Sequence, residues 1–182
     1  MNPDDLKPFS ISVDTINKYV KSTRVRAGRS INGLSLPAFT DANDRAEVET
    51  KLKECFKGLS DDADLKGQYY GLSTMSEEMT KELRGNGNLF QEPTGPALLA
   101  AAGAGRDWPN SRGIFCAESR KFFIWVNEED HMRIISMEEG GDIVAIFKRW
   151  SKGITTIKKL LEGMGSGLQF DEHFGYIHTC PS

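Results

Sequence analysis

The sequence is poor in histidine and cysteine, and it lacks any long apolar run. Its 182 residues include three histidines and three cysteines. No Cys/His spacing resembles a zinc site, and an odd number of widely separated cysteines argues against a disulfide framework. No apolar run reaches transmembrane length, and the first residues, MNPDDLKPFS, do not resemble a signal peptide. We therefore expect reduced thiols in a reducing compartment, the cytoplasm.

The chain also lacks a strong net charge. The net charge is −3, so no global excess of positive charge points to nucleic acid or to an anionic membrane as a partner. Hydrophobic residues make up 38% of the chain and charged residues 27%, which is ordinary for a soluble globular protein. The length suffices for one domain with a real core.

Patterns of apolar residues predict a domain that mixes strands and helices. Alternation and short apolar runs predict strands at 19–30, 67–72, 112–117, 121–127, 131–137 and 174–179. Helical spacing and caps predict helices at 41–59, from Ser76 to the Gly85–Gly87 stretch, at 94–105 as a buried helix, and at 142–161. Residues 1–18 are polar and are expected to be a linker that leads into the domain. The predicted class is α+β, with a largely antiparallel sheet flanked by helices.

The stretch STRVRAGRS carries two arginines on one face of a predicted strand. Side chains alternate along a strand, so Arg24 and Arg26 point the same way, with Ser22 on that side too. Two adjacent guanidinium groups repel each other unless an anion lies between them, and a polyphosphate suits because each can bind phosphate oxygens with two hydrogen bonds. The alternative is an exposed basic strand face.

The stretch WVNEEDHMRIISM places three acids side by side between two apolar runs. Glu128, Glu129 and Asp130 need a cation, either a metal such as Mg²⁺ or an organic guanidinium. Arg133 lies in the following apolar strand and needs an anion, either a protein carboxylate or a ligand phosphate. The alternative is a solvated acidic turn with Arg133 paired to a neighbouring acid. Together with the arginine strand, the cluster fits phosphoryl transfer to a cationic acceptor.

The stretch TCPS ends the chain and offers a candidate reactive thiol. Ser182 follows Cys180 by two residues, and a nearby hydroxyl or backbone N–H could stabilise a thiolate. The alternative is a buried, inert cysteine. Cys55 on its helix face and Cys116 in its strand are better explained by packing.

Five stretches resemble the phosphagen (guanidino) kinases, the family that includes creatine kinase and arginine kinase. STRVRAGRS, GQYYGLSTM, RDWPNSRGI, WVNEEDHMRIISMEEGG and GYIHTCPS occur in the order seen in that family. The resemblance covers nearly the whole chain. It implies reversible phosphoryl transfer between ATP or ADP, bound with Mg²⁺, and a small guanidino substrate. It also implies a catalytic domain similar to that of glutamine synthetase, and it allows a homodimer of the full-length protein.

The resemblance also implies roles for individual residues. The implied nucleotide-binding residues are Ser22, Thr23, Arg24, Val25, Arg26, Arg133 and, less securely matched, Gly87. Gly87 and the next residue, Asn88, stand where the family usually has a histidine. Glu129 is implied to hold the guanidinium and to orient the attacking nitrogen, and Cys180 is implied to be the reactive thiol beside it. Glu128 and Asp130 are supporting residues that tune the field near Glu129 and the Mg²⁺ waters. No protein ligand to the metal is implied, since Mg²⁺ is held through phosphates and water.

The chain stops at Ser182, before the family's glycine-rich segment and later phosphate-binding arginines. We therefore expect residues 19–182 to be the N-terminal part of the catalytic domain, truncated after the reactive cysteine and inactive by itself. Two alternatives stand beside this: a non-catalytic fragment that binds nucleotide weakly or self-associates, and a bacterial-type protein-arginine kinase. RDWPNSRGI and FGYIHTCPS lean toward the creatine kinase side of the family, but arginine, taurocyamine and lombricine kinases share much of this pattern.

Overall fold

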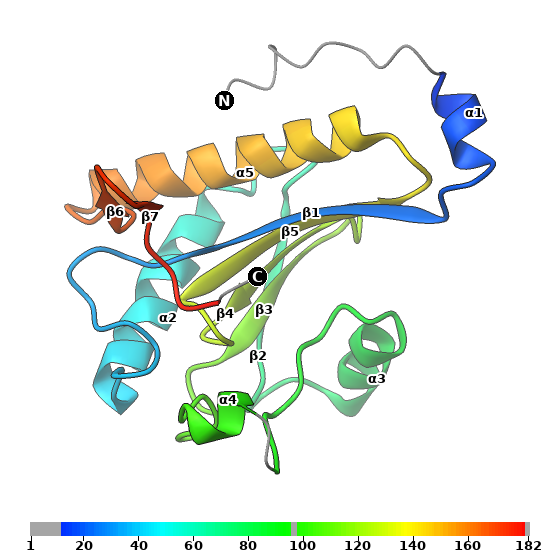
Figure 1. Cartoon of the computed structure of the whole chain (residues 1–182). Helices are drawn as coiled ribbons and strands as arrows, with labels where there is room; N and C mark the ends of the chain where they lie inside the picture. The colour runs from blue at the N-terminus through cyan, green and yellow to red at the C-terminus, as the bar shows by residue number, and fades with distance from the viewer. Residues whose placement is uncertain (1–11, 96–97, 181–182) are drawn as a thin grey trace.

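A five-stranded antiparallel sheet forms the centre of the structure. The computed structural model describes residues 12–95 and 98–180. The strand order across the sheet is β1-β5-β4-β3-β2, and every neighbouring pair is antiparallel. Helix α5 lies across one face of this sheet, while α3 and α4 lie on the other side (Figure 1). The predicted class, α+β with an antiparallel sheet flanked by helices, is confirmed.

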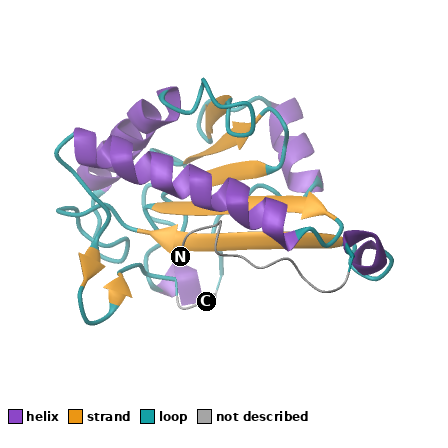
Figure 2. Cartoon of the chain, turned by 90° about the horizontal axis from the view of Figure 1, so that it is seen from above, coloured by secondary structure: helices purple, strands orange, loops and turns teal. Residues whose placement is uncertain are grey.

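The elements follow one another in an order that alternates helices with groups of strands. The strands of the large sheet are β1 (Ser22–Arg29), β2 (Gly67–Gly71), β3 (Gly113–Ala117), β4 (Phe122–Val126) and β5 (Met132–Glu139). The helices are α1 (Val13–Asn17), α2 (Ala42–Lys57), α3 (Glu77–Gly85), α4 (Leu98–Ala101) and α5 (Ile143–Gly163). A separate small hairpin pairs β6 (Phe170–Asp171) with β7 (Gly175–Tyr176). Figure 2 shows α5 lying over the sheet and this hairpin set apart from it.

Helices α2 and α5 begin at aspartate caps that the sequence supplies. The Asp41 carboxylate accepts a hydrogen bond from the backbone N–H of Asp44 at 2.8 Å, and Asp142 accepts one from Ala145 at 3.0 Å. Each cap satisfies a backbone donor that the first turn of a helix leaves unpaired. Both helices then bury an apolar stripe against the sheet.

Alternation along the central strands divides the core into two clusters, one on each face of the sheet. Phe122, Ile124 and Val126 of β4 pack with α2 and α5 in the larger cluster. Phe123 of β4 and Ile135 of β5 face the other way and pack with Leu83, Leu89 and Phe90 in the smaller cluster. Because β4 and β5 are buried on both faces, any polar side chain on them lies in the core unless it opens onto a site.

Two expectations about elements are corrected. The buried helix expected over 94–105 is the short α4, which buries none of its residues and leaves Leu98 79% exposed. Its chain turns at Gly103, whose φ of 78° lies in the left-handed region that ends helices. Pro96, expected near the start of that helix, lies outside the described residues. The polar linker over residues 1–18 contains α1, a five-residue helix capped by Ser12.

The strand expected at 174–179 is also wrong. Only Gly175 and Tyr176 are in strand β7, and they pair with β6 instead of joining the large sheet. The residues that follow leave the hairpin, and the backbone N–H groups of Thr179 and Cys180 bind a side-chain carboxylate, that of Asp130. The apolar pattern there therefore reflects a segment laid against the sheet and not a strand within it.

Candidate active site

The acid cluster lies where the sequence predicted, in the turn between β4 and β5. Asn127 begins the turn with φ of 54°, and its N–H donates to the carbonyl of His131 at 3.0 Å. Asparagine tolerates this left-handed conformation better than most residues. The Asn127 side chain also donates to the carbonyls of Arg45 and Ser111, at 2.9 and 2.8 Å. The turn is therefore held rigidly, although it carries three acids in a row.

Arg133 of β5 is the cation inside the cluster. Its Nη2 lies 2.9 Å from Glu129 Oε2, 3.4 Å from Asp130 Oδ2 and 3.5 Å from Glu128 Oε2. The residue is 5% exposed, so water does little to screen these pairs. The structure thus bears out pairing between Arg133 and the neighbouring acids, with Asp130 buried and Glu128 and Glu129 partly buried.

Burial and the neighbouring charges shift the pKa values of Arg133 and Glu128. Burial alone would lower the pKa of Arg133, but the charge of Glu128 and the hydrogen bond to Glu129 raise it above its ordinary value. The charge of Asp130 acts on Arg133 in the same direction. Burial raises the pKa of Glu128, an effect that Arg133 partly offsets. The cluster is therefore a desolvated site in which charge changes are costly.

The register of β1 against β5 places the strand arginines on the same face as Arg133. Arg24 lies opposite Met137, Arg26 opposite Ile135 and Gly28 opposite Arg133. Residues that oppose each other in an antiparallel pair share a face, so Arg24, Arg26 and Arg133 lie on one side of the sheet. Arg24 and Arg26 are exposed, and within the described part of the chain neither makes an ion pair or a side-chain hydrogen bond. This arrangement fits both an anion site and the alternative, an exposed basic strand face.

The other residues of the STRVR motif divide between the two faces. Thr23 and Val25 oppose Glu138 and Ser136, so their side chains lie on the face covered by α5, away from the arginines. The Thr23 hydroxyl donates to the carbonyl of Gly140 at 2.8 Å. Only the backbone of these two residues is therefore available to a ligand on the arginine face, whereas Ser22 shares that face.

The Gly87–Asn88 turn is connected to the same face through Trp125. Gly87 has φ of 67° and follows Asn86, the C-cap residue of α3. The Trp125 indole N–H donates to the carbonyl of Asn88 at 2.8 Å, and the same ring lies 5.9 Å from the guanidinium carbon of Arg133. One tryptophan therefore contacts both the expected nucleotide loop and the acid cluster.

The segment that carries Cys180 is held against the acid cluster by Asp130. Asp130 Oδ1 accepts hydrogen bonds from the backbone N–H of Thr179 at 2.7 Å and of Cys180 at 3.0 Å. Cys180 is buried and, like Cys55 and Cys116, is in no disulfide. Ser182, expected to influence the thiol, lies outside the described residues.

Comparison with known proteins identifies the family. Residues 47–182 match the family model of the ATP:guanido phosphotransferase C-terminal catalytic domain. The chain belongs to this family. It is 43% identical over 182 residues to the testis isozyme of creatine kinase from Oncorhynchus mykiss, a match that covers all of this chain and 46% of that protein. Over 165 residues it is 46% identical to lombricine kinase from Eisenia fetida, which covers 91% of this chain and 44% of that protein.

Solved structures of guanidino kinases share the fold. A crystal structure of lombricine kinase matches all of this chain and 48% of its own, with a TM-score of 0.90 and 39% identity. The duplicated taurocyamine kinase from Schistosoma mansoni, with bound transition state analog components, matches all of this chain and 24% of its own, with a TM-score of 0.85 and 34% identity. The chain therefore spans less than half the length of the relatives it matches.

Three features of the site escaped the sequence analysis. Gly28 admits the Asp130 carboxylate, because a Cβ at this position would lie 2.0 Å from Oδ2. Trp125 was counted only as part of an apolar run. Arg45 and Arg112, both buried, line a small cavity that also borders Asn127 and Glu128. A glycine inside a strand is a signal that could have indicated the close approach at Gly28. Nothing in the local sequence pattern indicates the long-range contacts of Trp125, Arg45 and Arg112.

No helix of the described residues is long and apolar enough to span a membrane. The same part of the chain holds no group of three or more His, Cys, Asp or Glu side chains suited to a metal ion.

Proposed function

We propose that the protein acts in ATP:guanidino phosphotransfer, the reversible transfer of the γ-phosphoryl group of MgATP to a guanidino nitrogen. The observation that carries the proposal is the single sheet face that presents exposed Arg24 and Arg26 together with Arg133 and its bound carboxylate, Glu129. Family membership supports the same reaction class. Phosphoryl transfer depends mainly on positioning and on charge, and this face offers cationic and anionic groups close together.

The residues present fit a nucleotide phosphate chain. Arg24 and Arg26 are exposed on adjacent positions of one face, where each guanidinium could bind phosphate oxygens with two hydrogen bonds. The hydroxyl of Ser22 would also bind the phosphate chain. Thr23 and Val25 would contribute backbone groups, and Gly87 would contribute the backbone of its turn. Bound Mg²⁺ would neutralise phosphate charge, held through phosphate oxygens and water. Arg133 is the third arginine of this phosphate site.

Glu129 is proposed to bind the guanidinium of the substrate. Its Oε2 already accepts from Arg133, and a carboxylate has further acceptor positions on both oxygens. The guanidino nitrogen attacks the γ-phosphorus, a P–N bond forms, and the bond from phosphorus to the ADP oxygen breaks. The nitrogen loses one proton, for which Glu129 is the acceptor. Glu128 would keep the cluster electronegative, and Cys180 would lie beside the guanidino group.

The substrate is proposed to be a small guanidino compound. Identities of 43% to a creatine kinase, 46% to a lombricine kinase and 44% to a glycocyamine kinase from Hediste diversicolor do not separate these substrates. We further propose a homodimer as the assembly and the cytoplasm as the compartment, with neither nucleic acid nor membrane as a partner.

The proposal is tested by incubating the complete natural protein that carries this sequence with MgATP and, separately, creatine, glycocyamine, lombricine, taurocyamine and arginine. ³¹P nuclear magnetic resonance distinguishes a P–N phosphoryl group from inorganic phosphate. We expect a P–N signal with at least one compound and its loss when excess MgADP reverses the reaction. ATP consumption that yields only inorganic phosphate, or no reaction with any of the five compounds, would count against the proposal.

A further inference from the structure

The carboxylate of Asp130 is the most deeply buried acid of the cluster. Its side chain is 0% exposed, whereas those of Glu128 and Glu129 are each 15% exposed. A buried carboxylate is costly unless hydrogen bonds and charges compensate for the lost water. The compensation comes largely from a distant part of the chain, the backbone N–H groups of Thr179 and Cys180.

Both of these N–H groups bind the same oxygen. Asp130 Oδ1 accepts from Thr179 at 2.7 Å and from Cys180 at 3.0 Å, while Oδ2 lies 3.4 Å from Arg133 Nη2. His178 is also close, with Nδ1 3.8 Å from Oδ1. One oxygen thus holds the C-terminal segment, and the other faces the arginine of the acid cluster.

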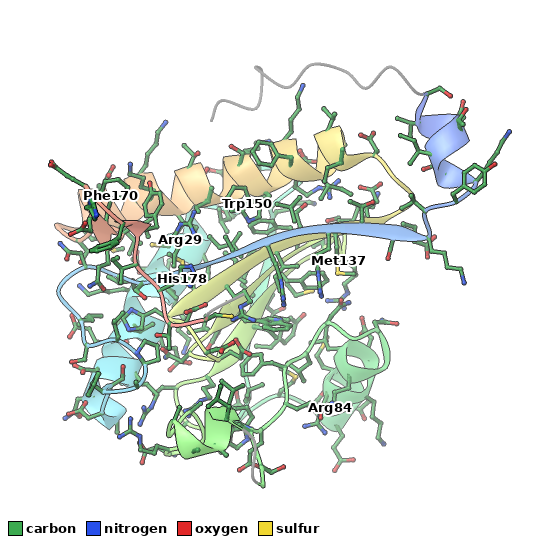
Figure 3. The ribbon with its side chains drawn as sticks, in the orientation of Figure 1. Arg29, Arg84, Met137, Trp150, Phe170 and His178 are labelled. Atoms are coloured by element: carbon green, nitrogen blue, oxygen red, sulfur yellow. The ribbon has the colours of Figure 1, made fainter. Side chains whose placement is uncertain are left out.

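Strand β1 is shaped to receive this carboxylate. Gly28 lies opposite Arg133 in the sheet, and a Cβ on Gly28 would lie 2.0 Å from Asp130 Oδ2 and 3.3 Å from His178 Nδ1. Any side chain at position 28 would therefore displace either the carboxylate or the segment that it holds. Figure 3 shows His178 beside Arg29, where the C-terminal segment crosses the end of β1.

We infer that Asp130 is a positioning residue that fixes the backbone of Cys180 against β1 and beside Glu129. It does so because Oδ1 is placed to accept hydrogen bonds from both backbone N–H groups. Any effect of the Asp130 charge on the site comes in addition. One side chain thereby sets the distance between three parts of the site: the arginine strand β1, the acid turn and the thiol. Its importance for phosphoryl transfer rests on the proposed function, whereas the anchor itself does not.

Hydrogen–deuterium exchange resolved to single amides tests the anchor. In Asp130→Ala, the amides of Thr179 and Cys180 lose a hydrogen bond to a charged acceptor, so they should exchange on the order of ten- to a hundredfold faster. Asp130→Asn keeps an oxygen acceptor and removes the charge. The amides of Thr179 and Cys180 should therefore exchange at least about threefold more slowly in Asp130→Asn than in Asp130→Ala.

Two further variants separate the anchor from general loosening. Gly28→Ala leaves Asp130 intact but occupies the place of its carboxylate, and it should accelerate the same two amides. Asp171→Ala is the matched control, because Asp171 also accepts two backbone N–H bonds, from His173 at 2.8 Å and Phe174 at 3.0 Å. It should accelerate only those two amides and leave Thr179 and Cys180 protected.

The outcomes decide between the alternatives. Unchanged protection of Thr179 and Cys180 in Asp130→Ala, or in Gly28→Ala, would overturn the inference. Equal exchange in Asp130→Asn and Asp130→Ala would show that charge, and not acceptor geometry, is responsible. If Asp130→Ala also accelerates exchange at the strand amides of Ile124 and Ile134, this variant has lost its fold. The exchange rates in Asp130→Asn and Gly28→Ala then decide whether Asp130 holds the segment.

The experiment requires no activity, so it separates the anchor from the proposed function. In a protein active in phosphoryl transfer, Asp130→Ala should lower kcat by as much as about 10²-fold, since small displacements of positioned groups can cost this much. The KM for MgATP should stay within about threefold of wild type, and Asp130→Asn should recover part of kcat. If the exchange rates follow the predicted pattern but the protein is inactive in phosphoryl transfer, the anchor stands and only the proposed function is contradicted.

Discussion

Arg133 Nη2 lies 2.9 Å from Glu129 Oε2, so the carboxylate proposed to bind a guanidinium already holds one from its own chain. The pair orients Glu129 before any ligand arrives, and it leaves acceptor positions on the carboxylate for a second guanidinium. Arg133 also balances the negative charge of Glu128 and Asp130. Substitution of Arg133 should therefore lower the stability of the fold as well as weaken ligand binding.

We predict that Arg133→Ala lowers the free energy of unfolding by about 3–5 kcal/mol, because three clustered carboxylates lose their buried partner. Urea denaturation at pH 7 and again at pH 4 measures this loss. The loss should shrink at pH 4, because burial raises the pKa of Glu128 and protonation of this residue relieves part of the repulsion in the cluster. Lys66→Ala is the control, since Lys66 pairs with Glu118 at the surface and should change stability by less than about 1 kcal/mol. A similar small effect for Arg133→Ala would show that the cluster is not balanced by this residue.

His131 should make the protein less stable in mild acid. It is fully buried, its Nδ1 accepts from the N–H of Ile31 at 3.0 Å, and its Nε2 lies 2.8 Å from the carbonyl of Ser35, which requires the neutral ring. Burial lowers its pKa below the ordinary value, while Ser35 and the charges of Asp130 and Asp44 partly oppose this.

The unfolded chain therefore binds more protons than the folded protein below the unfolded pKa of about 6.5. Stability should fall as the pH drops below that value, by at most about 1.4 kcal/mol per pH unit from this group. Thermal melts between pH 7.5 and 5 measure the slope, and His131→Asn should flatten it. An equal slope in both proteins would assign the effect to other groups.

Gly153 should be intolerant of even a methyl group. It lies in α5 directly over the sheet, and a Cβ there would lie 2.4 Å from the ring of Phe122, which is fully buried. Gly153→Ala should destabilise by about 1–3 kcal/mol, despite the higher helix propensity of alanine. Gly163→Ala, at the end of the same helix and with no atom within 4 Å of the new Cβ, should be neutral or stabilising by up to about 1 kcal/mol. Equal effects in urea denaturation would mean that α5 does not pack against Phe122 so closely.

In the complete natural protein, Cys180 should react with iodoacetamide faster than the other two thiols. Burial raises the pKa of Cys55 to about 11 and raises that of Cys116, although Arg120 partly opposes the shift at Cys116. The thiolate is the reactive form, so these two cysteines are poor nucleophiles at neutral pH. Peptide mass spectrometry at short labelling times measures the three rates. Equal rates would argue against a distinct role for Cys180.

The sequence predicted the sheet and the acid turn because their signals are local. Two short apolar runs between Lys121 and Met137 mark β4 and β5, and Asp41 and Ser76 mark helix starts with their own side chains. The face shared by Arg24 and Arg26 followed from alternation along one strand, whereas the position of Arg133 on the same face depends on the register between β1 and β5. Whether these arginines converge with Glu129 on one concavity stays a prediction.

The misses concern contacts between segments far apart in the chain. The apolar composition around Leu98 resembles a buried helix, yet α4 buries none of its residues, and Leu98 is exposed among the elements that the structure describes. The end of the chain resembles a strand, but its backbone groups are satisfied by Asp130, about 50 residues earlier in the sequence. Propensity contains no information about such a partner, because the hydrogen bond depends on the folded arrangement.

The most direct test of the account compares Glu129→Gln with wild type in the complete natural protein. Glutamine keeps size and hydrogen-bonding capacity but removes the charge that pairs with a guanidinium and the acceptor for its proton. Turnover should fall by at least about 10²–10⁴-fold. The Kd for MgADP, measured by calorimetry, should change by less than about threefold, because the phosphates are proposed to be held by Arg24, Arg26 and Arg133. Glu118→Gln, a surface carboxylate paired with Lys66, should leave both quantities unchanged. Intact turnover in Glu129→Gln, or damage confined to nucleotide binding, would contradict the assignment of Glu129 as the guanidinium partner.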